Sequence, residues 1–195
     1  EYASSSDTQI SLNGGSETTN FLLSLGHQEQ TTVYAKDFRY KTNSISGNLN
    51  HRSADRRFQM NLSNRFSNQK NNVINEDVTR VAYILSPNAP SLYQEDGNLN
   101  WQNKTFNNPV ASYNSTYSYD NVQFLNNINA GYEVLKNFRI KFSGGINYQA
   151  FEEWSIRPNT IYNPAYASGQ SSFYSQSNTS DYKKFSYILE PQLNW

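Results

Sequence analysis

The sequence predicts an all-β protein, an antiparallel up-and-down meander of about seven long strands. Apolar and polar residues alternate with period two, as in extended chain whose successive side chains point to opposite faces. The runs in the second half reach about a dozen residues, enough for the ~9–11 that a tilted strand needs to cross a bilayer and more than the roughly 5–6 usual in soluble domains. Connections between runs alternate between short and long. Together these observations indicate the wall of a transmembrane β-barrel.

The first predicted hairpin comprises residues 8–13 and 18–28, which alternate on either side of Gly14 and Gly15. A glycine pair between two alternating runs is a tight-turn signal. A longer, polar connection at about 28–37 follows. It separates this hairpin from the next.

The second predicted hairpin comprises strands within residues 40–51 and 58–67. Apolar Phe58 and Leu62 alternate with polar neighbours, and residues 51–57 form a short, charged turn. The pairing therefore repeats that of the first hairpin.

Residues 70–121 lose the period-two pattern and are predicted to form one long extracellular loop. A short helix is expected over residues 78–85, capped by the polar residues before it and ended at Ser86, which precedes a proline. A connection of this length is usually a lid or a binding loop.

The third predicted hairpin is the most regular part of the chain and comprises residues 122–135 and 138–150, joined by a minimal turn at Lys136 and Asn137. Residues 152–182 are rich in Ser, Asn and Tyr and are predicted to form a second extracellular loop. The last alternating strand follows it and reaches the end of the sequence.

Small turns at one rim and large loops at the other are typical of up-and-down outer-membrane barrels. A soluble β-sandwich with Greek-key connections has no reason to sort its loops in this way. The polar face is dominated by Asn, Ser and Gln, which suits a hydrated lumen. Residues 1–195 are therefore interpreted as part of one barrel domain, and as a piece of a longer protein, because the chain starts at Glu1 and stops at Trp195 inside a strand-like pattern.

Composition excludes several classes of site. The 16 basic and 16 acidic residues balance, which disfavours nucleic acid as a partner. Cysteine is absent, and the two histidines stand alone, so neither a thiolate nor a zinc site is expected. No run approaches the ~18 apolar residues of a membrane helix. The mean hydropathy of -0.81 is compatible with a barrel, whose alternating strands average out as polar.

Five segments of the chain carry a family resemblance, at residues 14–26, 37–40, 93–101, 108–111 and 132–138. In this order they resemble the SusC/RagA family of TonB-dependent outer-membrane transporters of Bacteroidetes. The resemblance covers nearly the whole chain, although Gln30 stands where the family usually has a glycine.

The resemblance implies a barrel of about 22 strands in the bacterial outer membrane, of which this chain supplies about a third. It also implies import of glycan or peptide fragments, with a SusD-like surface lipoprotein as lid and the TonB system as energy source through a plug region that this chain lacks. Membrane lipid would surround the wall. No cofactor is implied.

No catalytic site is expected. Glu152-Glu153 and Glu76-Asp77 are paired carboxylates, but adjacent residues on a strand or at a helix start point apart, whereas a glycosidase pair converges at ~5–9.5 Å across its substrate. Both pairs are interpreted as solvated loop charge and helix capping. An enzyme on a β scaffold is the third and weakest interpretation.

Aromatic residues in the two long loops are the candidate functional residues, for substrate binding or lid contact. Their broad faces supply contact area to sugars or to a lid protein at small entropic cost. Loop packing would explain these residues equally well. For Trp101 or Trp154, so would a place in an aromatic girdle at the membrane interface. In a soluble carbohydrate-binding β-sandwich, the second interpretation of the chain, they would form the binding platform. The candidates are Tyr93, Trp101, Tyr113, Trp154 and Tyr162.

Overall fold

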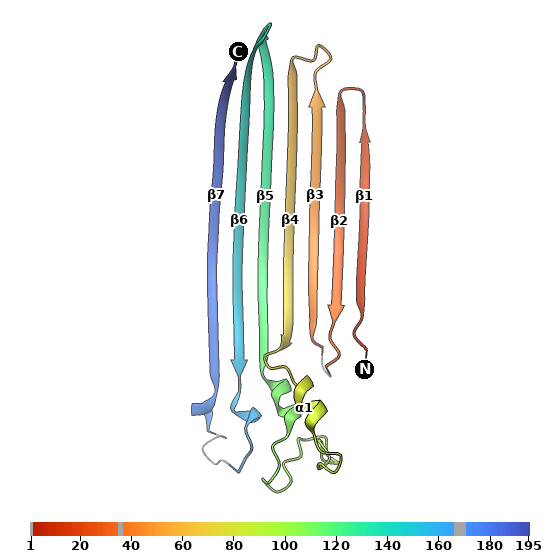
Figure 1. Ribbon diagram of the computed structural model, residues 1–195, viewed down its shortest axis with the longest axis vertical. Coiled ribbons are helices and arrows are strands. Elements are labelled where there is room, and N and C mark those ends of the chain that lie inside the picture. Colours follow the sequence, from red (N-terminus) through yellow and green to blue (C-terminus); the bar gives the residue numbers. More distant parts are fainter. Residues whose placement is uncertain (1, 35–36, 166–170) are drawn as a thin grey trace.

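The computed structural model describes residues 2–34, 37–165 and 171–195. Seven strands form a single antiparallel sheet in which each strand pairs with its neighbours in sequence (Figure 1). The prediction of an all-β, up-and-down meander is confirmed. The sheet is open, with β1 at one edge and β7 at the other. The strands are β1 (Ser5–Gly15), β2 (Thr19–Thr31), β3 (Arg39–Arg52), β4 (Phe58–Ile74), β5 (Thr116–Leu135), β6 (Phe138–Arg157) and β7 (Gln176–Asn194).

The strands extend further toward the long connections than the sequence predicted. β4 and β5 stay paired up to Ile74 and Thr116, so the long connection is 75–115, and the predicted boundaries of 70–121 were wrong. The second long connection is likewise 158–175 and not 152–182. The side chains of these strand ends are mostly polar on both faces. The sequence therefore shows no alternation of apolar and polar residues there, although the backbones pair.

The three longer connections gather at one end of the sheet and the three short turns at the other (Figure 1). The predicted helix is confirmed as α1 (Thr79–Ile84), and the Asp77 carboxylate accepts the Thr79 backbone N–H before its first turn. Three short 3-10 helices complete the connections. They are η1 (Pro109–Asn114), η2 (Asn159–Ile161) and η3 (Ser172–Tyr174).

The β5–β6 turn consists of Lys136 and Asn137, as predicted. Asn137 has a φ of 66°, in the left-handed region that asparagine tolerates better than most residues. A bulge between Glu133 and Leu135 precedes the turn and increases the local twist.

Cross-strand register places most of the apolar residues of the seven strands on one side, which we call the apolar face. One row of directly paired residues runs Phe21, Leu49, Leu62, Ile128, Gly144 and Leu189. Phe124 is 36% exposed, Phe142 37% and Leu189 64%, so the apolar face is open to its surroundings. Further members are Ile10, Leu12, Leu23, Leu25, Ile45, Phe58, Met60, Phe66, Ala130, Tyr132, Ile140, Ile146, Tyr148, Phe185, Tyr187 and Leu193.

Two asparagines interrupt the apolar face at one point. Asn64 and Asn126 lie directly opposite each other on β4 and β5, and the Asn126 amide donates to the Asn64 side-chain oxygen. Each thus supplies a hydrogen-bond partner to the other. That pairing reduces the cost of placing two amides among hydrocarbon side chains.

From the β1–β2 turn to the β5–β6 turn, each short turn lies further along the strand direction than the one before (Figure 1). The row that pairs Gly15 with Asn20 at the first turn reaches β5 at Asn129, and β5 then continues to Leu135 before turning. Such a stagger of strand ends is the register shift that tilted strands need in a barrel.

Candidate functional site

The second face of the sheet, which we call the polar face, carries amide and hydroxyl side chains in cross-strand rows. In one row the Asn61 amide donates to the Asn50 side-chain oxygen at 2.5 Å. Nearer the long connections, Gln149 donates to Asn121 and Asn121 donates to Gln69, each at 3.0 Å. This face can therefore offer many hydrogen-bond donors and acceptors to a polar ligand.

An aromatic ladder crosses the polar face close to the long connections. Tyr119 stacks on Phe151 with ring centroids 5.5 Å apart, and Phe151 stacks on Tyr182 at 5.3 Å. Beside the ladder, the Tyr117 hydroxyl donates to the Glu153 carboxylate at 2.7 Å. Sequence reasoning missed the ladder because it assigned Tyr119 and Tyr182 to the long loops, and Phe151 lies at the edge of the second predicted loop.

The three longer connections pack together into what we call the loop cluster, the described residues of 32–38, 75–115 and 158–175. Phe38 is 3% exposed and its ring meets Tyr113 edge-on at 6.3 Å, while Tyr34 meets Tyr113 at 6.1 Å. Ala111 and Ser115 are buried beside them. The loop cluster is thus a small folded unit with a core of its own.

Two buried asparagines hold the backbone of the loop cluster. Asn108 donates to the carbonyls of Leu92 and Asn100 and accepts the Val110 N–H as the cap of η1. Asn163 donates at 3.1 Å to the carbonyls of Lys104 and Phe106, and so ties the second long connection to the first.

Side-chain bonds also fix the loop cluster to the strands. Arg157 at the end of β6 pairs with Glu76 at 2.6 Å, and Asn75 donates to Ser155 at 2.9 Å. The buried Ser115 hydroxyl donates to the Ile156 carbonyl at 3.2 Å. The loop cluster therefore sits in a defined place at the end of β4, β5 and β6.

Four of the five predicted aromatic residues lie in the loop cluster. Tyr93 forms an isolated bridge with Leu99 and is 47% exposed, and the Trp101 carbonyl accepts the Phe106 N–H. Tyr113 belongs to the core with Tyr34 and Phe38. Tyr162 contacts Tyr174 edge-on at 6.3 Å.

Trp154 is an exception, because it lies within β6 and not in a loop. Its pairing with Ser118 places it on the same side of the sheet as the apolar face, beyond the apolar residues. The loop assignment of Trp154 was wrong. A position at the edge of an apolar surface fits the alternative role of an interfacial aromatic residue.

Glu152 and Glu153 also lie within β6, so their interpretation as loop charge was wrong. As neighbours on a strand they point to opposite faces. Glu152 belongs to a row of charges that borders the apolar face, in which Lys41 lies 3.6 Å from Glu29 and Lys70 3.2 Å from Asp120. The full row is Glu29, Lys41, Lys70, Asp120, Glu152 and Asp181.

Asp77 gives the loop cluster a dependence on pH. Hydrogen bonds from the Thr79 side chain, the Thr79 backbone and the Tyr34 hydroxyl lower the pKa of this carboxyl from 3.8 to about 2. A lowered pKa in the folded state stabilises the fold at pH values above the ordinary pKa. That stabilisation is lost as the pH falls through the folded pKa near 2.

We expect Thr79→Ala to raise the pKa of Asp77 more than Tyr34→Phe does, because Thr79 supplies the largest effects. A carbon-detected NMR titration of the Asp77 carboxyl measures both changes. An unchanged pKa in both variants would contradict the hydrogen bonds from Thr79 and Tyr34 to this carboxylate.

Neither a metal site nor a membrane-spanning helix occurs in the part of the chain that the structure describes. No group of three or more His, Asp or Glu side chains there could hold a metal ion. His27 instead contacts the Asn43 side chain, and His51 the Thr19 hydroxyl, both at 2.8 Å. No helix in the described residues is long and apolar enough to cross a bilayer.

Comparison with known proteins adds no identity: no family model matches the sequence, and no curated protein matches it.

Proposed function

We propose that this chain is a wall segment of a large outer-membrane β-barrel, of about 22 strands, in a SusC-like TonB-dependent transporter that imports glycan or peptide nutrients. The observation that carries the proposal is the open apolar face, which continues across all seven strands. Soluble monomers rarely leave apolar patches of more than a few hundred Å² exposed. Membrane lipid is the solvent that such a face requires.

The dimensions of the apolar face support this placement. From Phe58 to Phe66 the strand rises about 27 Å at ~3.4 Å per residue. A strand tilt of about 40° reduces this height to about 20 Å, close to the ~25 Å apolar band of outer-membrane barrels. The charged row containing Lys70 and Asp120 then lies at the border of the hydrocarbon region.

Open edges and staggered turns also favour a closed barrel. One side of β1 and one side of β7 lack a strand partner among the described residues. Unpaired backbone groups cannot remain in hydrocarbon, so both edges need further strands. The stagger of the short turns matches the tilt that closure demands.

In this arrangement the polar face lines the lumen, and the loop cluster faces the outside of the cell. The loop cluster is the surface on which a SusD-like lipoprotein lid would dock, with Tyr93 and Trp101 as contact residues. The TonB system would act through a plug region, and the wall itself would serve as pore lining.

Two other functions fit the structure less well. A soluble carbohydrate-binding sandwich needs a second sheet against the apolar face, and the described residues provide one layer only. A glycosidase needs converging carboxylates, and Glu152 and Glu153 point apart.

Cell fractionation of the full-length protein tests the proposal. We expect the protein in the outer-membrane fraction, and we expect it to stay monodisperse only in detergent or lipid. A monodisperse protein in detergent-free buffer would rule out the transporter and restore the sandwich interpretation.

A further inference from the structure

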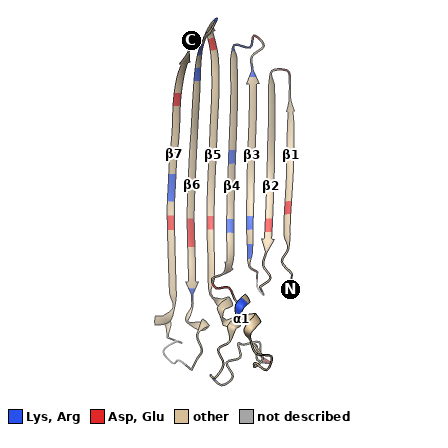
Figure 2. Ribbon diagram, viewed as in Figure 1, with Lys and Arg blue, Asp and Glu red and all other residues tan. Residues whose placement is uncertain are grey.

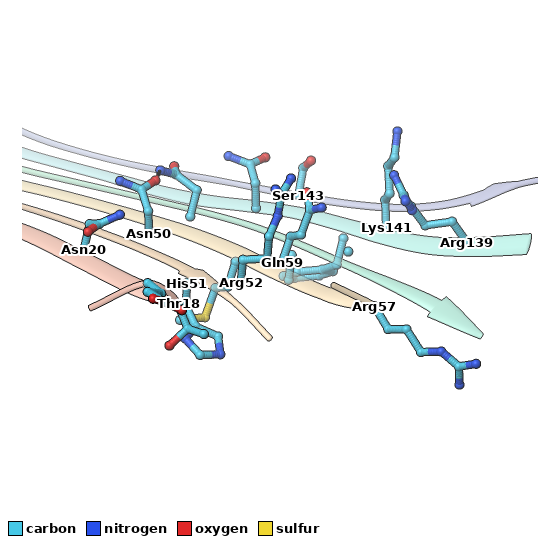
Figure 3. A pocket seen from close by; sticks show the side chains of 17 residues that line it. Thr18, Asn20, Asn50, His51, Arg52, Arg57, Gln59, Arg139, Lys141 and Ser143 are labelled. Carbon is cyan, nitrogen blue, oxygen red and sulfur yellow. Dashed lines mark hydrogen bonds between the residues drawn. The ribbon is translucent and has the colours of Figure 1, made fainter. Parts of the chain in front are cut away.

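Asn64 and Asn126 place two amides on the apolar face, where the rows on either side of them on β4 and β5 are apolar. At the short-turn end of the sheet, Figure 3 shows the side chains of Asn50 and Ser143 pointing to the polar face, whereas His51 points to the other side. The Asn64–Asn126 pair therefore needs polar surroundings that the apolar face does not supply.

These amides lie deep in the proposed hydrocarbon region. Leu62 is the middle of the apolar stretch 58–66, and Asn64 is two residues from it, about 5 Å of height in a strand tilted by about 40°. The polar groups of lipids begin about 12 Å from the middle of a ~25 Å apolar band. Most charged residues of the sheet lie nearer its ends than its middle (Figure 2), and the apolar face of β4 and β5 carries none between Lys70 or Asp120 and the short turns. Lipid and this face therefore offer the two amides no further partner.

Hydrogen bonding within the pair leaves part of each amide unused. The Asn126 Nδ2 group donates to the Asn64 Oδ1 atom. Among the described residues, the Asn64 Nδ2 donor and the Asn126 Oδ1 acceptor have no partner. An unmet amide in hydrocarbon is costly, and polar side chains inside membranes generally face one another or another protein segment.

The surface beside the pair is low enough for a second wall to approach. Gly47 on β3 pairs directly with Asn64. A Cβ on Gly47 would meet only the Leu23 Cδ1 within 4 Å, at 3.9 Å, so no side chain of the described residues covers this glycine. Small residues let the backbones of two membrane segments approach closely.

The free groups of the pair are complementary under two-fold symmetry. Two copies in one membrane have the same orientation, so their two-fold axis runs along the membrane normal and preserves height. With this axis in front of the β4–β5 pair, Asn64 of one copy faces Asn126 of the other, and a free donor meets a free acceptor twice. In the next row Phe66 faces Phe124 in the same way, because these two residues also pair directly.

We propose that two copies of the protein associate in the membrane through the strip of β4 and β5 around Asn64 and Asn126. Each Asn64 Nδ2 group donates to the Asn126 Oδ1 atom of the second copy, and Phe66 and Phe124 exclude lipid from these bonds. Ile128 borders the contact, where a charge is as unfavourable as in lipid because a second apolar wall also excludes it. This association rests on the proposed function, because it takes the membrane as the surroundings of the apolar face.

Energy transfer between donor-labelled and acceptor-labelled copies of the full-length protein in lipid vesicles tests the association. We expect the unaltered protein to form dimers, and we expect Asn64→Leu/Asn126→Leu to raise the dimer dissociation constant about tenfold or more. The matched control is Asn61→Leu/Asn129→Leu, because these two residues pair directly on the same strands but on the polar face. The control should leave the dissociation constant unchanged.

A second measurement keeps one amide of the pair in each copy. The chain has no cysteine. Copies carrying Asn64→Cys, mixed in vesicles with copies carrying Asn126→Cys, should form a disulfide-linked dimer on oxidation. Leu12→Cys copies should not link to Asn126→Cys copies, because Leu12 lies in the same register row but on β1, three strands from Asn64.

A monomeric unaltered protein would overturn the inference, as would dimers of Asn64→Leu/Asn126→Leu that are as tight as those of the unaltered protein. Disulfide links that join Asn64→Cys copies to other proteins, and not to Asn126→Cys copies, would also contradict it. Fractionation decides the proposed function separately: an outer-membrane protein that stays monomeric in vesicles rules out this association alone.

Discussion

Replacing Ile128 with arginine is expected to destabilise the full-length protein in lipid vesicles by about 2–4 kcal/mol, the cost of a cation near the bilayer midplane when the apolar face meets lipid as proposed. Ile128 lies in the middle row of the apolar face, between Leu62 and Gly144. A Cβ on Gly144 would lie 3.2 Å from the Ile128 Cγ2, which shows how closely this side chain covers the neighbouring strand. Equilibrium unfolding in urea measures the change.

The matched control is Asn127→Arg, one residue earlier on β5. Asn127 lies opposite Ser63 and Gly145 on the polar face, so its substitution places the same charge on the side that faces the lumen of the proposed barrel. We expect a change within about 0.5 kcal/mol there, as for surface substitutions in general. Equal costs for the two variants would mean that the faces meet the same solvent, and the lipid-facing assignment would be abandoned.

The sequence predicted strands wherever one face is apolar. Phe58 and Leu62 alternate with polar residues, and β4 begins where that alternation begins. Near Asn71 and Tyr119 the two strands still pair, but neither face is consistently apolar. Backbone pairing there leaves no periodic signature, so the loop boundaries were set too far into the strands.

That shift of boundaries also explains the missed aromatic ladder. Tyr119, Phe151 and Tyr182 were assigned to loops or loop edges, where aromatic residues show no common direction. Once the strands are extended, all three fall on the polar face, where Phe151 pairs directly with Tyr182 and Tyr119 lies diagonally across from Phe151. The same correction moves Trp154 from a loop to the opposite side of β6.

The loop cluster was beyond the reach of pattern analysis for a different reason. Asn108 and Asn163 stand before prolines, which indicates turns and nothing more. Most of their partners are backbone groups, and the two carbonyls that accept from Asn163 lie more than 50 residues earlier in the chain. Any residue can supply a backbone carbonyl, so no residue type or spacing in the sequence indicates these acceptors.

Asn163→Ala is expected to open the loop cluster. The substitution removes the donor to the Lys104 and Phe106 carbonyls and the acceptor for the Ala165 N–H. Asn163 is 6% exposed, so water replaces these bonds poorly, and the free energy of local opening should fall by about 1–3 kcal/mol. Hydrogen exchange at the amides of the first long connection measures the loss, with Asn178→Ala on exposed β7 as control.

Order in the loop cluster matters for the proposed lid, because a preformed surface binds without the cost of ordering its loops. Asn163→Ala should therefore weaken binding of the proposed lipoprotein while leaving the stability of the sheet unchanged, since its strands do not depend on this side chain. If exchange accelerates and lid affinity stays the same, the lid does not dock on the loop cluster. Its contacts would then have to come from another part of the protein.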